Sequence, residues 1–231
     1  MIGMDAAKAD LMRALGRLVR GLSLLFWGIP LALAADVETA RTDWLGAFGA
    51  LRFAPALVLS ALLWHGLRQL RDFQRQERVW QQALHRAEIF AILNTGFAPF
   101  LFWWHRFPSV PFYCVCVSFL ALSGYLFMIQ LNQMLLRLAA MLPDEMLRTE
   151  TRTFVSMNTW MLAAALGSLA AYFVLMLSPS APRLIGRHGA ALETIGEWLV
   201  LFLTLMPTAV TLALLWKIKE AIFTSFFEVE R

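Results

Sequence analysis

The chain has 231 residues, of which 59% are hydrophobic and 16% are charged, and its formal net charge is +4. Soluble domains carry about a quarter charged residues, so this composition argues against a soluble globular protein. The Lys and Arg residues flank long apolar runs, a placement that membrane topology and anionic lipid headgroups explain without nucleic acid. We therefore expect an integral membrane protein in contact with the lipid bilayer.

Six apolar runs follow one another along the sequence, and most are long enough for a helix to cross a bilayer. We predict an all-α fold, a polytopic transmembrane helical bundle that forms a single domain over residues 1–231. The expected spans are approximately 18–35, 45–67, 89–104, 112–136, 160–177 and 198–216. The longer connections, 68–88 and 137–159, are expected to hold helical extensions of these spans.

The first apolar run follows a basic amphipathic segment, residues 5–20, and it has two interpretations. A basic start, a short apolar core and the small residues Ala32 and Ala34 also describe a secretory signal peptide, which would be cleaved after Ala34. Residues 14–30 share spaced identities with residues 83–99, including a proline, and this favours a retained first helix. Both interpretations stay open on the sequence alone.

The second run contains Arg52 and follows a polar segment, residues 36–44, that is expected to be a loop. A charge inside a membrane is costly and by default suggests a function. Arg52 is expected either to reach the headgroups or pair with an acid of that loop, or to line a path for anions. No Asp or Glu falls near the midplane of a predicted span, which argues against proton-coupled transport.

The connection after the second run is rich in arginine, and its apolar residues are too sparse for a span. Such a segment suits a helix that lies against a membrane surface or a protein partner. We predict a cytoplasmic face for a partner or for lipid, which consists of Arg71, Arg75, Arg78, Trp80 and Arg86.

Short motifs recur at the boundaries of the runs. Leu62-Leu63-Trp64 reappears as Leu214-Leu215-Trp216, and Phe90-x-x-x-Asn94-Thr95 reappears as Phe154-x-x-x-Asn158-Thr159. Their positions at the ends and starts of successive runs predict three αα-hairpins. Asn94 and Asn158 are expected either to form interhelical hydrogen bonds or to contact a substrate or ion in two hairpins.

The fifth run carries Ala163, Gly167 and Ala171 at intervals of four residues. Small residues at this spacing let two helices approach closely, so we predict a packing surface, either inside the bundle or between subunits. Residues 178–197 contain many turn-forming side chains and are expected to be a loop, and residues 217–231 are expected to be a short amphipathic tail.

The sixth run places Thr204, Thr208 and Thr211 on one helical face beside Pro207. A proline inside a membrane helix frees a backbone carbonyl one turn earlier, and a hydroxyl can satisfy it. We expect the threonines either to repair the kink and pack, or to line a pore together with the two asparagines.

Lys and Arg are distributed unevenly over the connections. The two ends of the chain and the segments 68–89 and 135–159 hold fifteen of them, whereas the three opposite loops hold four. By the positive-inside rule both termini are expected in the cytoplasm, and we predict a multi-pass protein of the cell membrane, of the bacterial inner-membrane type.

No pattern in the sequence indicates catalysis. A nucleophile–base pair, a phosphate-binding glycine loop and zinc-ligand spacing are all missing. A membrane haem needs two histidines at one depth, and His65, His85, His105 and His188 supply no such pair. We therefore predict no catalytic, cofactor-binding or metal-binding residues.

Three functions remain after these exclusions. The first is a non-enzymatic subunit or scaffold of a larger membrane complex, assembled with other membrane proteins or with copies of itself, that acts through helix packing and its basic cytoplasmic face. The alternative is a channel or uncoupled transporter for a small solute or ion, with a path along the sixth span. A membrane enzyme or haem protein is the third.

Overall fold

The computed structural model describes residues 2–41, 51–177 and 181–227, and the regular elements in these ranges are all helices. The α-helices are α1 (Ile2–Arg41), α2 (Ala54–Leu70), α3 (Arg78–Phe97), α4 (Pro99–Arg106), α5 (Pro111–Met141), α6 (Glu145–Leu177) and α7 (Ala181–Phe227). The prediction of an all-α fold is confirmed for the described part of the chain.

Among the described residues, five helical segments are long and apolar enough to cross a membrane. They are Met12–Arg41, Arg78–Arg106, Pro111–Met141, Glu145–Ala171 and Leu201–Thr224, and the second of them joins α3 to α4. The predicted second span, 45–67, is only partly described, because residues 42–50 lie outside the described ranges and α2 has 17 residues. The fold therefore suits a multi-pass helical membrane protein.

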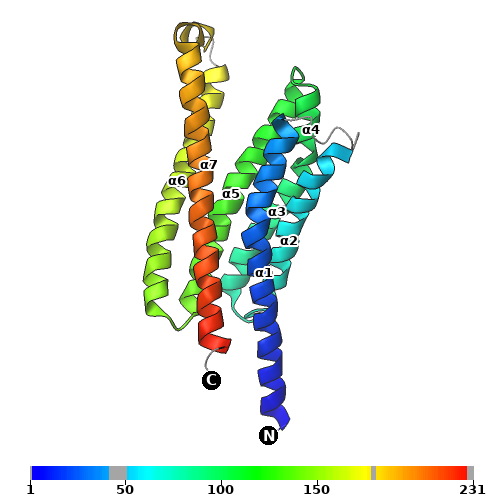
Figure 1. Ribbon diagram of the computed structural model, residues 1–231, viewed down its shortest axis with the longest axis vertical. Helices are drawn as coiled ribbons and strands as arrows, with labels where there is room; N and C mark the ends of the chain where they lie inside the picture. The colour runs from blue at the N-terminus through cyan, green and yellow to red at the C-terminus, as the bar shows by residue number, and fades with distance from the viewer. Residues whose placement is uncertain (1, 42–50, 178–180, 228–231) are drawn as a thin grey trace.

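The helices lie side by side along the long axis of the molecule (Figure 1). α1 packs along α2, α3 along α5, and α6 along α7. α5 also contacts both α6 and α7, and α1 contacts α7, so these contacts attach the α6–α7 pair to the other helices. α1 begins and α7 ends at the same end of the molecule (Figure 1), which we call the terminal end.

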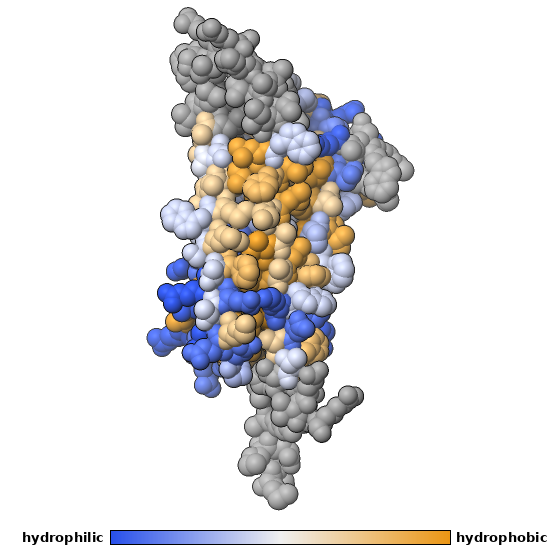
Figure 2. Space-filling model, turned by 60° about the vertical axis from the view of Figure 1, so that its left-hand side comes forward, coloured by the Kyte–Doolittle hydropathy of each residue, from blue (hydrophilic) through white to orange (hydrophobic). Residues whose placement is uncertain are grey.

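One continuous hydrophobic core joins these helices. On α1, buried leucines recur every three or four residues and form a single apolar face. They are Leu15, Leu18, Leu22 and Leu25, and the same core includes Leu67 of α2, Leu84 of α3, Leu135 of α5 and Ile218 of α7. On the outside, an apolar band covers the middle of the molecule, and hydrophilic residues gather below it, toward the terminal end (Figure 2).

Glycines allow α1 and α2 to approach each other closely. A Cβ atom added to Gly21 would lie 2.7 Å from the carbonyl oxygen of Gly66 and closer still to the Leu70 side chain. A Cβ atom added to Gly28 would lie 2.7 Å from Leu63 Cδ2. Small residues at helix contacts are a usual means of packing in membranes, where apolar surface alone gives little attraction between helices.

Three segments are helical where the sequence predicted something else. α1 continues to Arg41 through the first residues of the expected loop 36–44, because no glycine or proline interrupts residues 31–41. The expected loop 178–197 is helical from Ala181 onward, and its Pro182 stands in the first turn, where proline is tolerated. Residues 217–227 continue α7 and do not form a separate tail.

Candidate functional site

A buried polar contact joins α5, α6 and α7. Asn158 Nδ2 lies 3.1 Å from Asn132 Oδ1, 2.9 Å from Thr211 Oγ1 and 3.2 Å from the Pro207 carbonyl oxygen. Asn132 Nδ2 donates to Thr211 Oγ1 at 3.0 Å and to the Met128 carbonyl at 2.7 Å. We call Asn132, Asn158, Thr211 and the Pro207 carbonyl the asparagine cluster.

The asparagine cluster is fully enclosed. Asn132, Asn158 and Thr211 each have 0% of their surface exposed. The Asn158 amide has two hydrogens for three nearby acceptors, and its Oδ1 has no hydrogen-bond partner among the described residues. Because a buried amide is costly without its hydrogen bonds, the cluster favours one fixed arrangement of the three helices.

Two smaller contacts also start from α5. The Ser123 hydroxyl donates to Asn94 Oδ1 on α3, and the Tyr125 hydroxyl lies 2.9 Å from Thr204 Oγ1 on α7. Asn94 and Asn158, which the sequence paired as a repeat, therefore both form interhelical hydrogen bonds. The structure does not bring them together, since one joins α3 to α5 and the other belongs to the asparagine cluster.

Thr208 and Thr211 also donate their hydroxyls to carbonyls of their own helix, α7. Thr208 donates to the Thr204 carbonyl at 2.7 Å, and Thr211 donates to the Pro207 carbonyl at 2.8 Å. The carbonyl that loses its partner to Pro207 belongs to Leu203, so these two hydroxyls do not repair that position. Thr208 and Thr211 are both buried, and the stripe thus faces the interior of the bundle.

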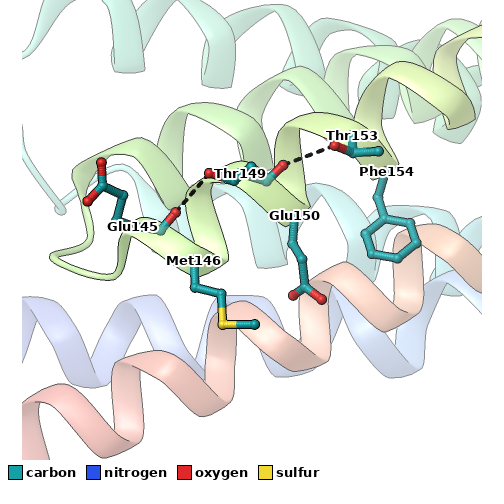
Figure 3. A pocket seen from close by; sticks show the side chains of 6 residues that line it. All are labelled: Glu145, Met146, Thr149, Glu150, Thr153 and Phe154. Atoms are coloured by element: carbon teal, nitrogen blue, oxygen red, sulfur yellow. Dashed lines mark hydrogen bonds between the residues drawn. The ribbon is translucent and has the colours of Figure 1, made fainter.

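An open hollow of about 720 Å³ lies on the outer side of α6, near the terminal end. Figure 3 shows its side chains along one stretch of that helix. They are Glu145, Met146, Thr149, Glu150, Thr153 and Phe154. Because all of them come from a single helix, this hollow is a surface and does not enclose a ligand.

The same surface continues onto α7. Glu150 pairs with Lys217 at 2.7 Å, and the Lys217 ammonium also lies 5.8 Å from the centre of the Phe154 ring. A second hollow of about 90 Å³ is lined by Phe154, Val210, Ala213, Leu214 and Lys217. Its lining is mostly apolar, so this hollow suits the packing of an apolar group and offers few polar groups for binding or catalysis.

The packing residues predicted on α6 are not covered by the described part of the chain. Ala163, Gly167 and Ala171 are all exposed, and a Cβ atom added to Gly167 would meet nothing within 4 Å. The interpretation of these residues as a contact inside the bundle therefore has no support from the described side chains. The interpretation as a contact between subunits stays a prediction.

The tryptophan of the predicted basic face differs from its arginines in exposure. Trp80 is 0% exposed and packs edge-on against Phe73, with 6.1 Å between ring centres. Its placement on a partner or lipid face is wrong, because the turn between α2 and α3 folds Phe73 back over it. The four arginines of that face, Arg71, Arg75, Arg78 and Arg86, are exposed.

Arg52 is half-buried and lies two residues before the start of α2. Two of the acids proposed as its partners, Asp36 and Glu38, belong to the last turns of α1, and the third, Asp43, lies outside the described residues. A structural role and a role in an anion path both stay predictions for Arg52.

Asn132 and Glu88 are buried polar residues that the sequence did not single out. Asn132 has no counterpart among the repeated motifs. The one feature that could have indicated its role is the position of a polar amide inside a long apolar run. Glu88 is 6% exposed and lies within the candidate span Arg78–Arg106, although the predicted span began at residue 89. Its Oε2 lies 3.7 Å from Arg71 Nη2, which gives the buried carboxylate a charged partner.

Asp72 lies between α2 and α3, outside the candidate spans, and pairs with Arg75 and Arg17. The hydrogen bond from Arg75, together with the charges of both arginines, holds the pKa of Asp72 below its usual value of 3.8 despite partial burial. The pairs connect the end of α2 to α1 near the terminal end.

Replacing Asp72 with Asn is expected to lower the free energy of unfolding at neutral pH by less than about 1 kcal/mol, the range of exposed ion pairs. Because the folded-state pKa is depressed, this contribution is present above pH 3.8 and is lost as pH falls through the lower folded-state value. Unfolding of wild type and Asp72→Asn should differ at neutral pH and coincide in strong acid. An unchanged difference in acid would contradict this assignment.

Comparison with protein-family models, with curated proteins and with solved structures finds no match to this chain. Among the described residues, no three His, Cys, Asp or Glu side chains group as metal ligands would. We therefore infer the function from the helix contacts and surfaces of the chain itself.

Proposed function

We propose that the chain is a non-enzymatic subunit of a larger membrane complex and that it acts through helix packing. In this proposal it crosses a bacterial-type inner membrane six times, as three αα-hairpins with α2 as the second span. Both termini, and the basic face of Arg71, Arg75, Arg78 and Arg86, lie in the cytoplasm. The excess of Lys and Arg at the terminal end supports this orientation.

The outer face of α6 carries the proposal. Along this face, a series of exposed residues recurs at alternating intervals of three and four positions in the sequence. They are Met146, Thr149, Thr153, Ser156, Trp160, Ala163, Gly167 and Ala170. This alternation keeps residues on the side of a helix that coils around another helix. We call this series the α6 seam.

The composition of the α6 seam favours a protein neighbour. Most of its members are small or carry a hydroxyl, and such residues let a second backbone approach closely and accept its hydrogen bonds. Trp160 is 76% exposed in the middle of the seam, where a neighbour would bury its large ring. Aromatic side chains of this kind are frequent anchors of protein interfaces.

The interior of the bundle supports a packing role over transport. Four of the residues considered for a solute path form bonds that hold α3, α5, α6 and α7 together, namely Asn94, Asn158, Thr204 and Thr211. A channel along α7 would need those groups to face water. In the present arrangement Thr208 and Thr211 are buried and bonded within the protein.

Replacing Gly167 with Leu is expected to release the partner subunits while the chain still folds. The new side chain points into open space in the isolated chain, so it strains nothing there, but it would hold a neighbouring backbone away from the seam. Purification in a mild detergent from native membranes, followed by sizing and identification of the components, measures the loss. We expect at least a tenfold decrease in co-purified partner, about 1.4 kcal/mol of binding free energy.

Gly96 supplies the matched control. It is an exposed helical glycine on α3, and a Cβ atom added to it also meets nothing within 4 Å. Gly96→Leu should retain the partners. If both variants retain them, or if both lose them equally, the α6 seam is not the contact.

A further inference from the structure

The repeated Leu-Leu-Trp motif of α2 and α7 buries its second leucine in both helices. The second leucine is buried in each, with Leu63 7% and Leu215 1% exposed. The tryptophans lie toward the surface, with Trp64 half-buried and Trp216 52% exposed. The leucines thus anchor each helix to the core and leave an indole at the outer surface.

A cation lies over each of these indoles. The Arg68 guanidinium is 5.1 Å from the centre of the Trp64 ring, and the Lys219 ammonium is 5.4 Å from the centre of the Trp216 ring. Contacts of this kind between a cation and a ring are weakly attractive at exposed sites. They hold the positive charge close to the apolar surface without neutralising it.

Neither cation is paired with an acid among the described residues, in contrast to its neighbours. Arg71, one turn beyond Arg68, lies 3.7 Å from Glu88, and Lys217, two residues before Lys219, lies 2.7 Å from Glu150. The two cations over the indoles therefore remain available for an external anion. Positive charge beside an indole at a membrane edge matches the phosphate of a lipid headgroup.

The two motifs lie at a similar height along α1. The ring centres of Trp216 and Phe26 are 5.6 Å apart, and Leu63 is the residue that a Cβ atom on Gly28 would meet. Phe26 and Gly28 are two residues apart on one helix, about 3 Å along its axis. Both helices then run on toward the terminal end, so Arg68 and Lys219 lie about one turn nearer to it than the indoles do.

From this arrangement we infer that Trp64 with Arg68, and Trp216 with Lys219, form two binding sites for the headgroups of anionic phospholipids. The indole contacts the glycerol and upper acyl region of the lipid, and the cation contacts its phosphate. The two sites flank α1, so bound lipid would also fill the surface between that helix and its neighbours. This inference does not depend on the subunit role or on which side of the membrane the terminal end faces.

The test is lipid retention by the purified full chain. The protein is exchanged into detergent with either phosphatidylglycerol or phosphatidylcholine, and bound lipid is counted by native mass spectrometry. Wild type is expected to prefer phosphatidylglycerol by about fivefold per site, the effect of one Lys or Arg at an anionic surface. The double variant Arg68→Gln with Lys219→Gln is expected to lose this preference.

The paired cation Lys217 provides the control. Lys217→Gln removes the same charge as Lys219→Gln, but from a cation paired with Glu150, and it should keep the preference. Trp64→Leu with Trp216→Leu should weaken retention of both lipids. Equal retention of the two lipids by wild type, or equal losses in Lys217→Gln and Lys219→Gln, would overturn the inference. Unchanged lipid retention with loss of a co-purifying protein would overturn it too and would assign the motifs to a protein contact.

Discussion

Replacing Asn158 with Leu is expected to lower the free energy of unfolding by about 2 kcal/mol. Leucine has a similar volume, so the change leaves little cavity but removes every hydrogen bond that the Asn158 amide makes to Asn132, Thr211 and Pro207. A buried acceptor left without a donor costs about 1–3 kcal/mol. Single interhelical bonds in membrane proteins contribute less, about 0.6 kcal/mol, and this variant removes several at once.

Unfolding in lipid bicelles with a denaturing detergent measures the loss. Asn94→Leu is the control, because Asn94 is only half-buried and its side chain has one interhelical bond, to Ser123. We expect that variant to lose about 0.6 kcal/mol. Equal losses at the two asparagines would contradict a structural role for the asparagine cluster.

A double-mutant cycle that combines Asn158→Leu with Asn132→Leu tests whether the asparagine cluster acts as one unit. Asn132→Leu and Asn158→Leu remove two members of the same network, so the loss in the double variant should be clearly smaller than the sum of the single losses. Strict additivity would mean that the two amides do not support each other. The same variants address the channel alternative, because a solute path through the cluster predicts altered flux at unchanged stability.

Replacing Gly21 with Ala is expected to lower the free energy of unfolding by about 2 kcal/mol. The added methyl group would lie 2.7 Å from the Gly66 carbonyl oxygen and 3.3 Å from Gln69 Cβ, and it would also overlap the Leu70 side chain. A carbonyl of the backbone cannot move aside as a side chain can, so α1 and α2 must separate. Overpacking of this kind costs about 1–3 kcal/mol.

Two other glycines give a graded comparison in the same unfolding assay. Gly28→Ala meets only the end of the Leu63 side chain, which can rotate away, so its loss should be smaller than that of Gly21→Ala. Gly96→Ala meets nothing within 4 Å and should be neutral or more stable by up to about 1 kcal/mol, since alanine favours helix over glycine. An equal effect at all three positions would exclude the close contact between α1 and α2.

Helix content and the apolar face of α1 were predictable because they depend on local spacing. The positions at which the helices begin and end were less predictable from the sequence. Residues 36–41 and 181–197 carry charges and turn-forming side chains, and the sequence favoured loops there. In the structure both continue as helix, because charge alone does not end a helix and Pro182 falls in its first turn.

Only part of the asparagine cluster could be predicted from the sequence. Asn158 was found because its motif recurs, whereas Asn132 was not, since its partners come from α6 and α7 and no local pattern marks it. Trp80 was misplaced for a similar reason, because its burial depends on Phe73 across a turn. Contacts between distant segments are fixed by packing and leave little trace in the local sequence.

The most direct test of the subunit role is the size and composition of the protein purified in mild detergent from native membranes. The proposal predicts a complex in which this 26.2 kDa chain is accompanied by other membrane proteins in fixed stoichiometry. A homo-oligomer without other subunits would shift the function toward the channel alternative. A monodisperse single chain with no partner would contradict the proposal.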